Sequence, residues 1–232
     1  MSFLAQRRGG AAHTRLLRTR RRLGEAVGLY RYSVTGFWPF LREHLPRKTG
    51  GTFLEAGAHD GWTGSNTYGL EAIWGWRGAL VEPVPELYRE CCVNRPRAKN
   101  FHAALVSADY PPPTITLETA GLLSTLVDSP LLEQSRQSAT NHYGAYSARQ
   151  ISVPARTLDS LILECGFAQL DFLSLDVEGF EEQALRGLDF ERRAPRFILV
   201  EANFPEPVHQ LLAPRYDLVA RLGDCDRFYA LR

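Results

Sequence analysis

Short apolar runs alternate with amphipathic stretches along most of the chain. Residues 52–56 form an apolar run with a single acid, followed by glycine, which predicts a buried strand. Residues 65–74 carry apolar side chains at helical spacing. Repetition of this strand–helix unit predicts a parallel sheet with right-handed crossovers. We expect strands at 52–56, 79–81, 100–106, 170–177 and 197–201, and helices at 65–74, 85–94, 157–165 and 180–188.

Residues 107–153 interrupt this alternation. They include three consecutive prolines at 111–113 and a strand-like run at 114–118, and continue as a polar stretch rich in Ser, Gln, Tyr and His. Because long segments of this kind are commonly lids or binding loops, we expect an insertion that closes over the active site. Near the end of the chain, residues 216–222 and 227–231 predict a hairpin.

The first 31 residues differ in charge from the rest of the chain. They contain eight Arg and one Glu and so carry +7, whereas the whole chain of 232 residues carries +1. A basic arm of this kind suits RNA, a membrane surface or an acidic partner, and it is also typical of a solvated, partly disordered tail. We favour the tail, and divide the chain into an arm at 1–31 and a domain at 32–232.

Composition places the whole chain among ordinary globular proteins, with 44% hydrophobic and 23% charged residues. No apolar run approaches the roughly 20 residues that span a bilayer, and the amino terminus lacks the apolar segment of a secretory signal. The six His are scattered, and the four Cys form no C-x-x-C pair. We therefore expect a cytoplasmic protein with reduced thiols and no metal site.

The segment Glu55-Ala56-Gly57-Ala58-His59-Asp60-Gly61 follows the first predicted strand. Ligands of open α/β sheets bind beyond the carboxyl ends of strands, so this turn is a candidate binding loop. A dinucleotide fingerprint, G-x-G-x-x-G, would need glycine at His59 and Trp62. Its absence disfavours NAD. S-adenosylmethionine (SAM), which has an amine, a sulfonium and no phosphate, suits a single glycine turn with a nearby acid such as Glu55.

Acids also follow two other predicted strands. Glu82 comes one βα unit after the glycine turn, where an acid accepts the hydroxyls of a ribose; an ordinary loop acid is the alternative. Asp176 and Glu178 follow an apolar strand, and residues two apart on a strand point the same way. Both carboxylates can therefore face the crevice, although acids also favour the start of a helix.

At these residues the chain resembles the FkbM family of SAM-dependent methyltransferases. The resemblance covers about residues 50–231 and rests on several motifs in order. They are 53–61 (FLEAGAHDG), 64–68 (GSNTY), 75–78 (GWRG), 81–83 (VEP), 157–161 (TLDSL), 171–179 (DFLSLDVEG) and 198–201 (ILVE). The family commonly has Asp-Val-Gly-Ala-Asn at the glycine turn, where this chain has Glu55-Ala56-Gly57-Ala58-His59, so His59 replaces an Asn.

This resemblance implies a Rossmann-like class I methyltransferase fold. We expect a seven-stranded, mostly parallel sheet with helices on both faces and an antiparallel strand near the end. The expected cofactor site comprises Glu55, Gly57, Ala58, His59, Asp60, Gly61, Asn66, Glu82, Pro83, Ala103, Ala104 and Asp176.

The resemblance also implies methylation of a hydroxyl on a sugar, a glycan or a natural product. Enzymes that methylate exocyclic amines often carry Asn/Asp-Pro-Pro-aromatic where this chain has Asp176-Val177-Glu178-Gly179, which favours oxygen as the acceptor. We expect Glu178 to be the base and Asp176 to anchor the cofactor or substrate, with the reverse assignment open. His59 is a further candidate base.

Three alternatives remain. An RNA methyltransferase would use the basic arm, and its RNA affinity would depend on salt. A non-catalytic SAM-binding protein would use the insertion as an interaction surface. A dehydrogenase is weakened by the missing glycines.

Overall fold

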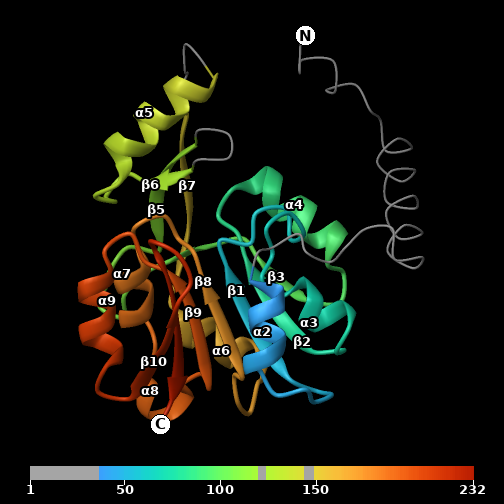
Figure 1. Cartoon of the computed structure of the whole chain (residues 1–232). Helices are drawn as coiled ribbons and strands as arrows, with labels where there is room; N and C mark the ends of the chain where they lie inside the picture. Colours follow the sequence, from blue (N-terminus) through green and yellow to red (C-terminus); the bar gives the residue numbers. More distant parts are fainter. Residues whose placement is uncertain (1–36, 120–123, 144–148) are drawn as a thin grey trace.

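The computed structural model describes residues 37–119, 124–143 and 149–232, and its centre is a seven-stranded sheet (Figure 1). The strand order is β10-β11-β9-β8-β1-β2-β3, and only β11 runs antiparallel to the others. The expected Rossmann-like fold and its mostly parallel sheet are thereby confirmed. The strands are β1 Thr52–Ala56, β2 Arg77–Val81, β3 Lys99–Phe101, β8 Phe172–Leu175, β9 Phe197–Glu201, β10 Tyr216–Arg221 and β11 Asp226–Leu231.

Helices cover both faces of this sheet because side chains alternate along its buried strands. On β1, Phe53 packs with residues of α2 (Trp38–His44), α3 (Tyr68–Ala72) and α4 (Pro85–Asn94). Leu54 points to the opposite face. That face is covered by α6 Leu158–Cys165, α7 Glu181–Arg186, α8 Phe190–Arg193 and α9 Pro205–Leu212.

Local sequence signals set several helix starts. The side chain of Thr157 accepts a hydrogen bond from the Ser160 amide and caps α6. Pro85 opens α4, a position where the missing proline N–H costs nothing. Both helices therefore begin where the sequence predicts, within one residue.

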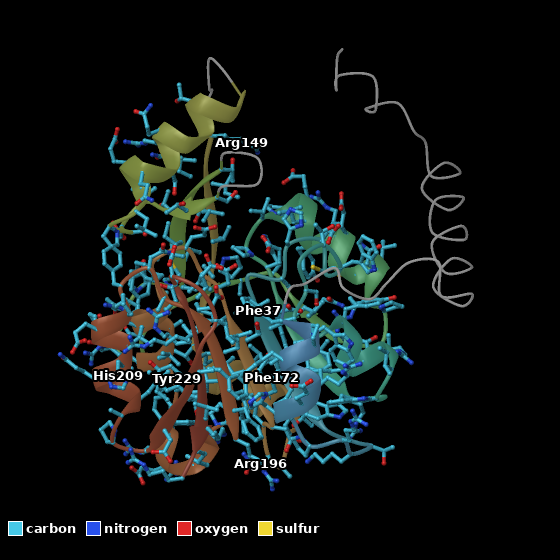
Figure 2. All side chains as sticks on the ribbon, in the orientation of Figure 1. Phe37, Arg149, Phe172, Arg196, His209 and Tyr229 are labelled. Atoms are coloured by element: carbon cyan, nitrogen blue, oxygen red, sulfur yellow. The ribbon has the colours of Figure 1, made fainter. Side chains whose placement is uncertain are left out.

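The insertion forms a second sheet that projects from the carboxyl edge of the first. Its strand order is β4-β7-β5-β6, and α5 (Leu132–Tyr143) lies at its far end (Figure 1). Arg149 lies near this end, whereas Arg196 lies at the opposite end of the molecule (Figure 2). The second sheet has its own buried apolar cluster, which joins it to the first sheet. Its strands are β4 Ala104–Leu105, β5 Thr114–Thr119, β6 Thr125–Leu126 and β7 Arg149–Arg156.

Several expected elements differ from the structure. The strand expected at 100–106 is divided, because β3 ends at Phe101 and Ala104–Leu105 pairs with β7 of the second sheet. The helix expected at 65–74 shortens to Tyr68–Ala72, since residues 65–67 form side-chain bonds with Glu55 instead of a helical turn. Helices α5, α8 and α9 and strand β7 were not expected.

Other sequence-based expectations concern residues that the structure does not describe. The arm at 1–31 lies outside the described residues, as do 120–123 and 144–148 of the insertion. Within the described part of the chain, no helix combines the length and apolar character needed to cross a membrane. The four Cys are free thiols.

Gly57 joins the ends of three strands. Its φ is +77°, its amide donates to Val81 O, and a Cβ at this position would lie 1.8 Å from Asp176 O. Gly64 has a similar φ of +72° but open space around it.

We predict that Gly57→Ala destabilises the fold more than Gly64→Ala. Both substitutions place a Cβ in a left-handed conformation, at about 1–2 kcal/mol, and only the first adds a clash worth about 1–3 kcal/mol more. Urea denaturation of the two variants measures the difference. Equal midpoints would mean that β8 moves away from Gly57 without cost.

Candidate functional site

A cavity, here called the central cavity, opens at the carboxyl ends of β1, β2 and β8. The second sheet closes its other side through Leu117, Ser124 and Leu126. It therefore lies where ligands bind in open α/β sheets. The remaining lining residues are Ala56, Gly57, His59, Val81, Glu82, Pro83, Val84, Leu87, Ala103, Ala104, Leu105, Asp176, Val177 and Glu178.

Glu82 is a buried carboxylate at the end of β2. One oxygen accepts the His59 amide and the other accepts the Val84 amide, each at 2.9 Å. Burial raises the pKa of this carboxyl to about 7. Each carboxylate oxygen has a second acceptor position, so Glu82 can also accept two hydroxyls of a ligand in the cavity.

His59 occupies the turn between β1 and α3 in an unusual conformation. Its φ is +52°, which is uncommon for a residue other than glycine. Both ring nitrogens are buried and make no hydrogen bond, and Nδ1 lies 3.6 Å from Asp60 Oδ1. Asp60 raises the pKa of this imidazole. A polar group without a partner beside a cavity is suited to bind a ligand.

The last turns of α4 hold this loop in place. Cys91 Sγ, Asn94 Nδ2 and Arg95 Nη1 donate in order to the backbone carbonyls of residues 59, 60 and 61, at 2.9, 2.7 and 3.0 Å. Three consecutive carbonyls are thus satisfied from one helix. The loop that lines the cavity is fixed by side chains behind it.

Glu55 points away from the central cavity, toward α3 and α4. Its carboxylate accepts Ser65 Oγ, the Asn66 amide and Thr67 Oγ1 at 2.6–2.7 Å, and Arg95 Nη1 lies 3.8 Å away. The cationic group that faces Glu55 in this structure is therefore Arg95. Because these bonds occupy the carboxylate, Glu55 supports the loop from behind.

Arg95 is the central residue of this support, with 1% of its surface exposed. Its guanidinium donates to Glu71 Oε2 at 2.8 Å, and also to Ser65 Oγ and Thr67 Oγ1. Its charge lies 5.3 Å from the ring centre of Phe53. A buried guanidinium with several acceptors ties α4, α3 and β1 into one unit.

Two acids follow β8 at the edge of the central cavity. Burial and the nearby Glu201 carboxylate raise the pKa of both Asp176 and Glu178. Among the described residues, neither side chain has an ion-pair partner. Uncompensated carboxylates with raised pKa are typical of functional sites.

The second sheet contacts the turn that carries Glu178. The φ of Glu178 is +53°, and Ser129 Oγ donates to its backbone carbonyl at 2.9 Å. A Cβ added at Gly179 would lie only 2.8 Å from Leu131 Cδ1 and 2.9 Å from Ser129 Oγ, so both side chains pack directly against this glycine. The insertion therefore helps to hold Glu178 in a conformation that is costly by itself.

Of the residues expected from the sequence, eight line the central cavity and five do not. Residues that do not line it form the supporting loop and its contacts: Glu55, Ala58, Asp60, Gly61 and Asn66. The amide oxygen of Asn66 is buried without a hydrogen-bond partner. Those that line it are Gly57, His59, Glu82, Pro83, Ala103, Ala104, Asp176 and Glu178.

The sequence placed the insertion over the site but did not single out Leu117, Ser124 and Leu126 as the residues that line the cavity. The polar stretch of the insertion includes His142, Tyr143 and Tyr146, whose side chains lie outside the described part of the structure. Among the described residues, no three His, Cys, Asp or Glu side chains are grouped as metal ligands.

Comparison with known proteins identifies the family of this chain and finds a solved structure with a similar fold. The family model of the methyltransferase FkbM domain matches residues 55–218. A crystal structure of methyltransferase FkbM from Methylobacillus flagellatus aligns with a TM-score of 0.52 at 15% identity, over 87% of this chain and 48% of that one. This chain thus spans about half of that protein's length. No curated protein matches.

Two further solved structures are similar to smaller degrees. A TehB-like SAM-dependent methyltransferase from Corynebacterium glutamicum has a TM-score of 0.42 at 14% identity, over 95% of this chain and 99% of its own. A SAM-dependent methyltransferase from Aquifex aeolicus has a TM-score of 0.42 at 12% identity, over 83% and 88%.

We predict that Arg95→Met destabilises the fold by about 3–5 kcal/mol, because it leaves Glu55 buried without its cation and leaves Glu71 with the exposed Arg97 as its remaining ion-pair partner. Arg97→Met is the matched control. Arg97 also pairs with Glu71 but is 68% exposed, so its loss costs less than about 1 kcal/mol. Urea denaturation measures both. Similar losses for the two variants would show that the buried guanidinium has no special role.

Proposed function

We propose, since the chain belongs to the FkbM family of SAM-dependent methyltransferases, that it methylates a hydroxyl of a sugar, a glycan or a natural product. The observation that carries this proposal is the position of Glu178. Glu178 lines the central cavity together with Glu82, and its carboxyl group has a raised pKa and no ion-pair partner among the described residues. A candidate base therefore lies at the cofactor cavity.

The central cavity fits SAM in its residue types. Glu82 has free acceptor positions for the ribose hydroxyls. Pro83, Ala103 and Ala104 offer small apolar walls for the adenine. His59, with two buried ring nitrogens that lack partners, is a further group for the cofactor. The cavity carries no glycine-rich phosphate cradle, which supports SAM over NAD.

When bound, SAM supplies a methyl group that its sulfonium already activates, so the main task of the chain is positioning. An alcohol is a poor nucleophile while it keeps its proton. The acceptor hydroxyl must lose its proton as it gains the methyl group that bound SAM would supply, and Glu178 would take that proton. A positioned base contributes roughly 10²–10⁴-fold to such a step. Asp176, at the strand end itself, is proposed to anchor the cofactor or substrate.

The charge of the central cavity weighs against a nucleic-acid acceptor. Glu82, Asp176 and Glu178 line the cavity, and no Lys or Arg of the described residues does. A phosphate backbone would be repelled there, whereas nucleic-acid sites are rich in Lys and Arg. The basic arm at 1–31 lies outside the described residues, and its use in binding RNA stays a hypothesis.

We predict that the protein binds S-adenosylhomocysteine but not NAD, and that its affinity falls as pH decreases. Ribose binding uses the charged form of Glu82, whose pKa is raised to about 7. From pH 8 to pH 6 the charged fraction, and hence the affinity, falls roughly tenfold. Calorimetry with both ligands at several pH values is the measurement.

Two variants show whether Glu82 or His59 is the group whose titration changes the affinity. Glu82→Gln weakens binding by about 1–3 kcal/mol and removes the pH dependence. His59→Asn removes the imidazole that faces Glu82 and keeps the pH dependence. An unchanged pH profile in Glu82→Gln, or binding of NAD alone, would sink this part of the proposal.

We predict that Glu178→Gln lowers turnover at least about 100-fold while the affinity for S-adenosylhomocysteine changes little. Turnover of the unmodified protein falls as pH decreases through the raised pKa of Glu178, because only the carboxylate takes a proton. Transfer of label from radioactive SAM to fractionated cell extract measures it, with the distant Glu43→Gln as control. Near-normal turnover in Glu178→Gln would place the base elsewhere. Binding without transfer by the unmodified protein would favour a non-catalytic role.

A further inference from the structure

A hydroxyl without a partner lies in the wall that the second sheet contributes to the central cavity. Ser124 directly precedes β6 and lines the cavity, and its Oγ is buried with no hydrogen-bond partner among the described residues. Its neighbours in this wall, Leu117 and Leu126, are apolar and pair across β5 and β6. A buried hydroxyl without a partner is costly, so a polar group of a bound ligand is the expected partner.

The next hydroxyl along the chain has its partner within the protein. Thr125 Oγ1 donates to Ser135 Oγ of α5 at 2.7 Å, so this side chain points toward α5. Successive residues of an extended chain point to opposite faces. The residues on either side of Thr125, which are Ser124 and Leu126, accordingly both line the central cavity. The fold therefore satisfies one hydroxyl of this pair and leaves the other for the cavity.

The wall that carries Ser124 packs against the part of the first sheet that is proposed to hold the adenine. Leu117 and Leu126 share one buried apolar cluster with Val84 and Ala104. Val84 and Ala104 also line the central cavity, and Ala104 is itself one of the walls proposed for the adenine. An adenine against these residues therefore lies next to the wall of the second sheet.

The position proposed for the ribose agrees with this placement. Glu82, which is proposed to accept the ribose hydroxyls, directly follows β2, and its carboxylate accepts the Val84 amide at 2.9 Å. Because adenine is bonded directly to the ribose, the base lies close to Glu82 and Val84. Its two faces are apolar, and its edge carries an amino group and ring nitrogens. A serine hydroxyl both donates and accepts, so it can bond either kind of edge group.

We propose that Ser124 binds the edge of the adenine of SAM, so that the second sheet is a part of the cofactor site. The hydroxyl donates to a ring nitrogen or accepts from the amino group, while Leu117 and Leu126 cover the base beside it. This inference rests on the proposed function. It assigns to the insertion a task that begins when the cofactor binds, before any acceptor is present.

The first experiment divides the cofactor into parts. Calorimetry measures the affinities of the unmodified protein, Ser124→Ala and Ser152→Ala for two ligands. They are S-adenosylhomocysteine and 5′-methylthioadenosine, which has the adenine and the ribose but no amino acid. We expect Ser124→Ala to weaken both ligands by the same factor, about five- to tenfold. Ser152→Ala is the matched control because it removes an exposed hydroxyl of β7, and it leaves both affinities unchanged.

Each other outcome of this experiment contradicts a different claim. A loss confined to S-adenosylhomocysteine would place Ser124 at the amino-acid part of the cofactor and overturn the adenine assignment. Unchanged affinity for both ligands would overturn the inference and leave the proposed function intact. No binding of S-adenosylhomocysteine by the unmodified protein would overturn the proposed function, and the inference with it.

Thermal denaturation distinguishes a ligand contact from a structural role. Without ligand, Thr125→Val lowers the Tm because Ser135 loses its hydroxyl partner. Ser124→Ala removes a hydroxyl that has no partner among the described residues, so it keeps or raises the Tm without ligand. It also reduces the increase in Tm that S-adenosylhomocysteine causes, whereas Thr125→Val keeps that increase. Equal losses of Tm in the two variants without ligand would show a structural role for Ser124 and contradict the inference.

Hydrogen exchange measures the contact of the second sheet with the cofactor. S-adenosylhomocysteine alone is expected to slow exchange of the β5 and β6 amides in the unmodified protein, and to slow it less in Ser124→Ala. If exchange in these strands is the same with and without S-adenosylhomocysteine, the second sheet does not contact the cofactor and the proposal is wrong.

Discussion

The buried guanidinium of Arg95 is the constraint on which the rest of the site depends. A guanidinium cannot lose its charge in a protein, so its five N–H groups need acceptors wherever it is buried. Here the acceptors come from a loop carbonyl, from Glu71 and from hydroxyls ahead of α3. With residues 59–61 held in this way, the His59 amide reaches Glu82 at 2.9 Å. The cavity wall is thus a consequence of contacts on its far side.

Much of the fold follows from the sequence, because apolar runs and turn residues are local signals. Residues 52–56 and 197–201 form strands with the expected bounds, and 85–94 forms the expected helix. The second sheet does not follow in this way. Its β4 is two residues long and pairs with a strand about fifty positions later, so only tertiary contacts define it. Likewise α9 contains two prolines, and prolines in a sequence usually indicate a loop. The structure places Pro205 in the first turn of α9, where a helix tolerates proline.

The candidate site shows the same division. Glu82 and Asp176 line the cavity because each follows a strand of the parallel sheet, as position along the chain predicts. Glu55 is one residue short of the end of β1, and alternation turns its side chain to the face that carries α3 and α4. The partner that this side chain meets on that face is Arg95, and no pattern within the 55–61 motif reveals an arginine at the end of α4.

The contact between Ser129 and the Glu178 carbonyl has a consequence for protein engineering. An insertion of this length could be exchanged as a unit between related enzymes in order to change the acceptor. In this chain Ser129 of the insertion donates a hydrogen bond to the backbone carbonyl of Glu178, the proposed base, and Leu131 fills the space that Gly179 leaves open. A chimera that replaces 107–153 therefore needs a matched residue pair at 129 and 131. Otherwise the exchanged insertion would bring a new cavity wall and would also displace the turn that carries Glu178.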